Sequence, residues 1–292
     1  MFIDIHMHTR NIPCFPRAWD GKTNATPAQV VRMYDSLDIE RGVILPDVSP
    51  ECSRGPQSIE EVLEICETYS PRFIPFTNVD PRWLTNSPDA PLDRILAFYR
   101  EKGCRGVGES MANLPFDHPM TWNLFTCCEK AGLPLTFHIA PAIGGYYGIY
   151  DEPGLPLLEK SLEQFPDLVF LGHSQAFWAE IGPLENVDDR GGYPEGPVKQ
   201  GGRVVELMRT YPNLHGDLSA NSGFNAVSRD EVFGAEFMDE FRDRLYFGTD
   251  ITTDGMEPPL GGYLLKLRNE KKISEEIFQK IAKQNAEKLL KL

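Results

Sequence analysis

Four of the six histidines in this sequence occupy positions in which they could bind a metal ion. His6 and His8 are separated by one residue in the N-terminal segment MFIDIHMHTR, and His138 and His173 each end a short apolar run. Alternate residues of a strand point to the same side, so the side chains of His6 and His8 should project together. Imidazole nitrogens bind Zn²⁺, Mn²⁺ and Fe²⁺ well, and the four side chains therefore suggest a transition-metal site.

Two acidic residues extend this candidate metal site. Glu109 ends the run GVGE, and Asp250 ends the run FGTD. A carboxylate offsets part of the charge of a cation, and a shell of His, Asp and Glu without Cys is typical of catalytic zinc sites. An open coordination position would bind water and lower its pKa toward ~7. Each residue alone would more often be structural, and it is their joint occurrence at the ends of apolar runs that indicates chemistry.

Eight short apolar runs predict the strands that would position these residues. They cover residues 1–7, 42–46, 73–79, 103–108, 134–139, 168–172, 214–218 and 245–248. Helical patterns alternate with them at 26–37, 58–69, 89–102, 119–131, 155–165, 202–211, 235–242 and 274–290. This alternation predicts a closed (β/α)8 TIM barrel, in which the carboxyl ends of all strands meet on one face. A doubly wound open sheet is the alternative, although no glycine-rich dinucleotide fingerprint follows the first run.

Residues 1–292 are expected to form a single barrel domain with one extended loop. That loop, at about 174–201, follows the sixth strand and is rich in glycine and proline. Long structured loops in compact domains commonly serve as lids or binding loops. Of the remaining histidines, His215 shares a strand face with Asp217 and is expected to be packed and hydrogen-bonded. His118 falls in a helix-entry loop and is expected to be solvated.

The charge and the cysteines restrict the class of function. The 29 basic and 43 acidic residues give a net charge of −14, which argues against a nucleic-acid partner. No uninterrupted apolar stretch of about 18 residues is present, so no membrane span is predicted. The six cysteines form no C-x-x-C pair, and reduced thiols of a cytoplasmic protein are the expected state. A small-molecule substrate is the remaining expectation.

Residues in the loops after the strands are candidates for substrate binding. Three arginines could clamp a substrate carboxylate through a guanidinium fork, Arg10, Arg17 and Arg54. Surface ion pairs with nearby acids are an equally good reading of each arginine. Aromatic residues that could wall a planar substrate, or simply pack within the loops, are Trp19, Tyr146, Tyr147, Phe177 and Trp178.

The motifs resemble the amidohydrolase superfamily, and specifically its amidohydrolase-related branch. That branch includes aminocarboxymuconate semialdehyde decarboxylase, resorcylate decarboxylases, oxalomesaconate hydratase and pyrone-dicarboxylate lactonase. The resemblance covers essentially the whole chain. It is carried by DIHMH at 4–8, GVGE at 106–109, FH at 137–138, LGH at 171–173, FGTD at 247–250 and NAEKLL at 285–290.

The resemblance implies roles for the site residues. Metal ligands are implied for three histidines, His6, His8 and His138. Asp250 is implied as a ligand or as the carboxylate that transfers a proton. His173 would be an acid, base or electrophile beside one metal ion, or a ligand of a second. Glu109 could join the first ion or recruit a second, and a hydrogen-bonded structural role is its alternative.

The resemblance leaves two reaction classes open. One is hydrolysis of an amide, ester or lactone bond in a small carboxylate-bearing substrate by metal-activated water. In that reaction Asp250 would accept the proton of the water, and His173 would polarise the carbonyl. The other is non-oxidative decarboxylation or hydration, in which His173 or Asp250 would protonate carbon. The expected cofactor is a divalent transition metal, Zn²⁺ first and Mn²⁺ or Fe²⁺ next, with one ion required and a second possible. A homodimer is also compatible with the resemblance.

Overall fold

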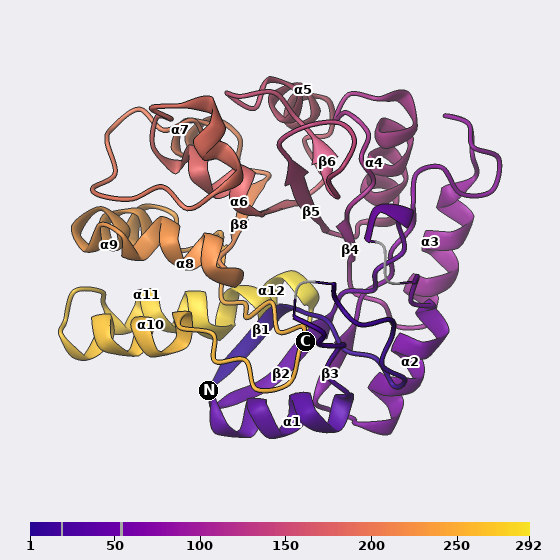
Figure 1. The fold of residues 1–292 in the computed structure, drawn as a ribbon, viewed down its shortest axis with the longest axis horizontal. Helices are drawn as coiled ribbons and strands as arrows, with labels where there is room; N and C mark the ends of the chain where they lie inside the picture. The colour runs from indigo at the N-terminus through magenta and orange to yellow at the C-terminus, as the bar shows by residue number, and fades with distance from the viewer. Residues whose placement is uncertain (19, 53–54) are drawn as a thin grey trace.

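Parallel strands alternate with helices along the chain in the computed structural model, which describes residues 1–18, 20–52 and 55–292 (Figure 1). Eight strands correspond to the eight predicted runs: β1 (Phe2–Met7), β2 (Ile39–Ile44), β3 (Phe73–Pro75), β4 (Val107–Ser110), β5 (Leu135–Ala140), β7 (Phe170–His173), β8 (Leu214–Asp217) and β9 (Leu245–Tyr246). A further short strand, β6 (Ile149–Tyr150), pairs with the end of β5 and is not predicted by the sequence.

The strands form a ring in which two sheets are joined by single bridges. One sheet has the order β1-β2-β3 and the other β4-β5-β7-β8-β9, and all pairings are parallel. A bridge between Thr77 and Val107 joins β3 to β4, and a bridge between Met7 and Ile251 joins β1 to the segment after β9. The fold is therefore the predicted TIM barrel, with weak pairing at two seams.

Helices surround the ring (Figure 1). Seven predicted helices are present: α1 (Pro27–Ser36), α2 (Ile59–Thr68), α3 (Leu92–Glu101), α4 (Pro119–Ala131), α5 (Pro156–Gln164), α7 (Arg203–Thr210) and α9 (Glu231–Glu240). The eighth is a continuous run of α11 (Glu275–Gln279), a π-helical segment (Lys280–Gln284) and α12 (Asn285–Leu290). Ser58 and Ser274 cap α2 and α11, because their side chains accept hydrogen bonds from Glu61 N and Ile277 N.

The sequence does not predict three other helices, which are α6 (Gln175–Trp178), α8 (Ala220–Ser228) and α10 (Leu260–Asn269). Helix α8 contains glycine, serine and asparagine, which favour helices weakly. Tertiary packing therefore stabilises α8, since its intrinsic helix propensity is weak. A Cβ atom at Gly223 would lie 2.4 Å from the carbonyl carbon of Leu218, so only glycine lets the helix approach the strand end this closely.

The interior of the ring is filled by apolar side chains. One buried cluster joins residues from both sheets and from the last helix: Ile3, Ile5, Val43, Leu45, Ile74, Phe76, Leu171, Tyr246, Ala286 and Leu290. Because this cluster contains residues of both sheets, it lies in the interior of the ring. Helix α12 contributes Ala286 and Leu290, so the C-terminal helix packs against the barrel core. The polar site described below therefore stands on an apolar floor.

The glycine-rich segment at 174–201 is anchored beside the barrel. It contains α6 and two short 3₁₀ turns, Ala179–Ile181 and Val187–Gly191. Buried Arg190 donates from Nε to Glu180 (2.7 Å) and from a terminal nitrogen to the carbonyl oxygen of Asp151 (2.5 Å). None of the described residues that line the cavity at the candidate site belongs to this segment. Its role as a lid or binding loop therefore stays a prediction.

All six cysteines are free thiols. Within residues 1–18, 20–52 and 55–292, no helix combines the length and the apolar character that spanning a bilayer requires.

Candidate active site

The H-x-H pair lies at the carboxyl end of β1, and both imidazoles are fixed by their Nδ1 atoms. Nδ1 of His6 lies 2.6 Å from Asp217 Oδ2, and Nδ1 of His8 lies 2.8 Å from the carbonyl oxygen of Leu45. A carbonyl oxygen and an ionised carboxylate both accept hydrogen bonds and cannot donate them. Both Nδ1 atoms are therefore the donors. The Nε2 atoms then face each other at 3.1 Å. Two nitrogen lone pairs meet at one point, which is a favourable position for a proton or a metal ion.

Buried carboxylates surround His6. Burial by itself would lower the pKa of His6, but the Asp217 and Glu109 carboxylates raise it well above its ordinary value. Burial would raise the pKa of Glu109, yet the imidazoles of His6 and His138 hold it well below the usual range. The carboxylates of Asp217 and Glu109 are thus ionised in the barrel interior, and they favour positive charge at His6, which lies between them.

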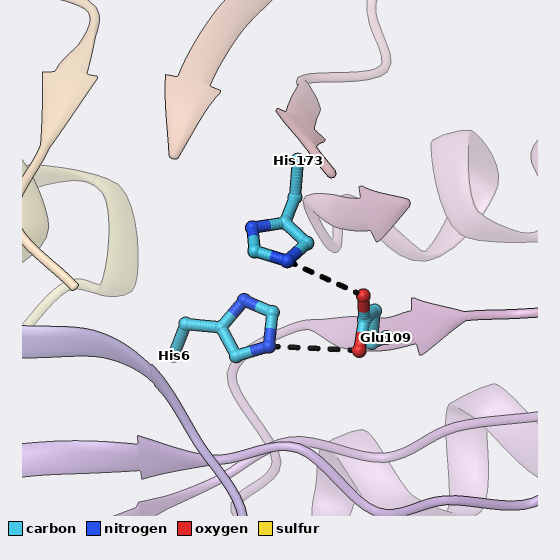
Figure 2. Close-up of side chains that lie close together, drawn as sticks. All are labelled: His6, Glu109 and His173. Carbon is cyan, nitrogen blue, oxygen red and sulfur yellow. Dashed lines mark ion pairs between the residues drawn. The ribbon is translucent and has the colours of Figure 1, made fainter. Parts of the chain in front are cut away.

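Glu109 lies between two groups of imidazoles at the end of β4. Figure 2 shows one oxygen of its carboxylate facing His6 and the other facing His173. Oε2 lies 3.5 Å from His6 Nε2 and 3.6 Å from His8 Nε2. Oε1 lies 2.8 Å from His138 Nδ1 and 3.7 Å from His173 Nε2. Each oxygen of one carboxylate thus faces a different pair of histidines.

Asp250 approaches the same point as the H-x-H pair. Its Oδ1 lies 3.7 Å from His6 Nε2 and 3.6 Å from His8 Nε2. Its backbone N–H donates to the carbonyl oxygen of His6 (2.8 Å), which ties the end of β9 to β1. The residue has a left-handed φ of 55°, and its side chain is 27% exposed, against 5% for Glu109. Asp250 is thus the carboxylate that the cavity reaches most readily.

The donor set fits a divalent transition metal. Among the described residues, two groups of three side chains each have their donor atoms within 4.8 Å of one another. One group is His6, His8 and Asp250, and the other is His6, Glu109 and His173. Imidazole nitrogens and carboxylate oxygens without thiolates are the ligands expected of catalytic Zn²⁺ or Mn²⁺. His138 is in neither group, and its Nδ1 contacts Glu109 instead. A metal-ligand role for His138 stays a prediction.

The residue Asp4 behaves differently from the expectation that strand alternation gives. Regular alternation along β1 would place Asp4 one layer below His6, on the same face of the strand. Its oxygens instead accept from Tyr34 Oη (2.6 Å) and from Thr249 Oγ1 and backbone N (2.5 and 2.9 Å). The pairing register of β1 with β2 shifts between Asp4 and Met7, so simple alternation fails there. Asp4 connects β1 to α1 and to the strand-end Thr249.

A cavity of about 830 Å³ opens over these groups. It is lined by ligand candidates, by loop residues after several strands and by three aromatic rings. The residues from the loops include Phe15, Arg17, Asp47, Glu51, Cys52, Met111, Tyr146, Tyr147, Thr252 and Met256. This volume is in the range of small-molecule sites. The carboxyl ends of the strands therefore form an open mouth above the histidines, as expected for a barrel enzyme.

The predicted substrate-binding residues have different outcomes. Arg17 and Tyr146 line the cavity, and Arg17 also donates to Asp20 and Thr252. Arg10 is 5% exposed and donates to the carbonyl oxygens of Gly55 and Pro56 and to Asp47, so it holds the loop after β2. Arg54 lies outside the described residues, as does Trp19.

Trp178 is a core residue rather than a wall of the cavity. It is 2% exposed, and its indole N–H donates to the carbonyl oxygen of Asp217 (2.9 Å). The preceding Phe177 is also buried and packs over Gly172, where a Cβ atom would lie 2.4 Å from the ring. Helix α6 turns both rings toward the barrel wall because they follow the strand end directly. The sequence alone could not show that orientation.

Two residues at the site carry more weight than sequence reasoning gave them. Asp217 accepts from His6, and its only signal was its shared strand face with His215 and Ser219. Tyr147, rather than Tyr146, packs on His138, with ring centroids 4.7 Å apart. The glycine that follows makes this contact possible, because Gly148 has φ +114° and a Cβ atom there would lie 2.9 Å from the His138 ring.

The remaining histidines lie away from the metal-site candidates. His215 stacks on Tyr246, with Nδ1 2.8 Å from the phenol oxygen, which confirms a packed and hydrogen-bonded role. His118 is the N-cap of α4 and accepts from Met120 N, so it has a local structural role at the helix entry.

Comparison with solved structures supports the barrel architecture. An uncharacterised TIM-barrel protein from Bordetella bronchiseptica is 17% identical, with 99% of this chain and 98% of that chain covered and a TM-score of 0.67. A probable 2-pyrone-4,6-dicarboxylic acid hydrolase from Acinetobacter baumannii is 14% identical, with 100% and 99% covered and a TM-score of 0.62. A dihydroxybenzoic acid decarboxylase from Polaromonas, solved with manganese and an inhibitor, is 15% identical, with 100% and 97% covered and a TM-score of 0.59.

At these identities the structural likeness establishes the fold alone. No curated protein gives a match to the sequence. A family model described as Amidohydrolase matches residues 3–292, which includes the H-x-H pair, Glu109, both later histidines and Asp250. The chain belongs to this amidohydrolase family.

Proposed function

We propose that this protein is a metal-dependent hydrolase that acts on an amide, ester or lactone bond of a small substrate. The observation that carries the proposal is the position of Glu109. Its two oxygens face separate histidine pairs, and Asp250 lies at the more exposed side of the first pair. A single carboxylate shared by two sets of nitrogen donors is suited to hold two cations close together.

We infer two cation positions rather than one. The first would use His6, His8 and Asp250 with Oε2 of Glu109. The second would use His138 and His173 with Oε1. The sequence favours one required ion and leaves a second open, and the placement of both Glu109 oxygens supports the second. A divalent cation supplies Lewis-acid stabilisation of developing negative charge and lowers the pKa of a water that it coordinates.

The side chains of the protein provide the remaining chemistry. Asp250 is partly exposed to the cavity and ionisable, so it can accept a proton from attacking water and deliver it to the leaving group. Tyr147 lines the same cavity beside His138 and can donate a hydrogen bond to a substrate oxygen. Arg17 is the predicted carboxylate-binding arginine that lines the cavity, and it would fix the distal end of an anionic substrate.

Decarboxylation of a hydroxylated aromatic acid is the second candidate. It is supported by the aromatic side chains Phe15, Tyr146 and Tyr147 around the cavity and by the fold likeness to a protein described as a dihydroxybenzoic acid decarboxylase. In that reaction His173 or Asp250 would protonate the ring carbon as carbon dioxide leaves. The first set of donors would serve both reactions. The second cation position that Glu109 offers favours hydrolysis, because two cations together stabilise both the attacking and the leaving oxygen.

A paired assay separates the two candidates. The protein is stripped with a chelator, reloaded with Zn²⁺ or Mn²⁺, and incubated with carboxylated lactones and amides in one arm and dihydroxybenzoates in the other. Ring opening or amide cleavage without carbon dioxide is the expected result. Carbon dioxide release from the benzoates alone would replace the hydrolase by the decarboxylase. Undiminished turnover by the stripped protein would contradict both.

A further inference from the structure

Asp217 lies behind the histidines, on the side away from the cavity. Its Oδ2 atom is 2.6 Å from Nδ1 of His6 and 3.5 Å from Nδ1 of His173. These two imidazoles come from β1 and β7 and reach Glu109 from different directions (Figure 2). Asp217 is fully buried, and it contacts the far nitrogen of one histidine in each of the two donor sets.

The carboxylate of Asp217 is held rigidly. Oδ1 accepts from the backbone N–H of Ser219 (3.0 Å), and the carbonyl oxygen of Asp217 accepts from the indole of Trp178. A Cβ atom at Gly248 would lie 2.9 Å from Oδ1, so glycine on the neighbouring strand end leaves just enough room for the carboxylate. The position of Asp217 is therefore determined from three sides, as expected for a group that orients its neighbours.

The contact decides which nitrogen of His6 is free. An ionised carboxylate accepts and does not donate, so the proton of a neutral His6 stays on Nδ1. Nε2 then presents its lone pair to His8, Asp250 and Glu109. With the opposite tautomer, an N–H would point into the donor set, and a cation could not bind to that nitrogen. His173 has a second hydrogen-bond partner at Nδ1, because Ser219 Oγ lies 3.0 Å away.

We propose that Asp217 is a positioning residue that fixes the Nδ1–H tautomer of His6 and orients His173, and that it thereby sets the metal affinity of the site. The inference rests on the proposed metal dependence. It goes further in naming a residue that touches neither metal nor substrate. Outer carboxylates of this kind typically change metal affinity by about 10–100-fold.

The test uses Zn²⁺ alone and needs no substrate. Asp217→Asn keeps the shape of the side chain and removes its charge. Asp151→Asn is the matched control, because Asp151 is also a fully buried carboxylate with backbone donors, at the start of α5 and outside the site. Zinc affinity is measured by competition with a chromophoric chelator. We expect Asp217→Asn to bind zinc about 10–100-fold more weakly and Asp151→Asn to bind it like the wild type.

A spectroscopic readout tests the tautomer directly. In zinc-loaded wild-type protein labelled with ¹⁵N-histidine, His6 should show a protonated Nδ1 and a metal-bound Nε2. An Nε2–H tautomer of His6 in the wild type would overturn the inference, and this result needs no folded variant. Equal zinc affinity of the wild type and Asp217→Asn would also overturn it. If the wild type bound no transition metal, the proposed function itself would fail.

Discussion

The imidazoles of His6 and His8 face each other through their Nε2 atoms at 3.1 Å, while both Nδ1 atoms donate elsewhere. The β1 strand brings the pair together because the two residues flank one position at its carboxyl end. Separate acceptors, Asp217 and Leu45, then fix the two tautomers. In neutral imidazoles two lone pairs would repel at this distance, so the pair is built around a positive charge.

Removal of one member of this pair should strongly weaken metal binding at the first cation position. We expect His8→Ala to lower zinc affinity more than roughly 100-fold, beyond the range that outer-shell partners reach. His118→Ala is the control, since His118 only caps α4, and it should cost about 1 kcal/mol of stability and leave zinc content unchanged. Elemental analysis and the thermal midpoint of each variant give the two readouts. Full zinc content in His8→Ala would remove the H-x-H pair from the site.

Glu109 determines how many ions the site holds. Glu109→Gln replaces one carboxylate oxygen by an amide nitrogen that cannot bind a cation. We expect the wild type to bind two equivalents of Zn²⁺ and Glu109→Gln to bind one or none. Titration of the chelator-treated protein with elemental analysis after dialysis measures the stoichiometry. Two retained equivalents in the variant would show that Glu109 is not shared.

Tyr147 and Tyr146 form a natural comparison, because both line the cavity and only Tyr147 packs on His138 in the described contacts. Tyr147→Phe keeps the ring and loses the hydroxyl. With a substrate found in the paired assay, we expect kcat/KM to fall about tenfold, which corresponds to about 1.4 kcal/mol. Tyr146→Phe should change it less than about twofold, which is below the range of a single hydrogen bond. Equal effects of the two variants would argue against a specific role for Tyr147.

His215 should make stability depend on pH, away from the candidate site. Burial, with Arg244 nearby, lowers the pKa of His215 to about 4 from its ordinary 6.5. Its neutral form is favoured by folding, so the contribution is fully present above pH 6.5 and is lost as the pH falls toward 4. We expect the thermal midpoint of the wild type to fall more steeply between pH 6.5 and 4 than that of His215→Asn. Parallel curves would show that His215 does not titrate as described.

The sequence predicts which ligand candidates lie close together, because of the barrel topology. His6, His138, His173, Glu109 and Asp250 are far apart in the chain, but each lies near the carboxyl end of a strand. In a closed parallel ring the carboxyl ends of strands meet on one face, so strand position alone brings these side chains together. The apolar runs therefore predict this proximity even where the bounds of a strand differ by a few residues from the predicted run.

The sequence does not predict how Arg10 and Trp178 are oriented, because loops and short helices orient them. Arg10 follows the metal motif directly, yet it turns to the backbone of 55–56. Trp178 follows His173 closely, yet α6 directs its indole to Asp217 O. Asp217 has no motif, and its role depends on an exact distance to His6. Such outcomes are set by tertiary packing, which no local pattern encodes.

Anomalous diffraction at the zinc edge from crystals grown with Zn²⁺ would show directly whether the barrel mouth holds two cations. We expect two anomalous peaks, one beside each oxygen of Glu109. The first should be coordinated by His6, His8 and Asp250, and the second by His138 and His173. If no anomalous density lies at the carboxyl ends of the strands, with zinc either absent or bound elsewhere, these residues do not form a metal site.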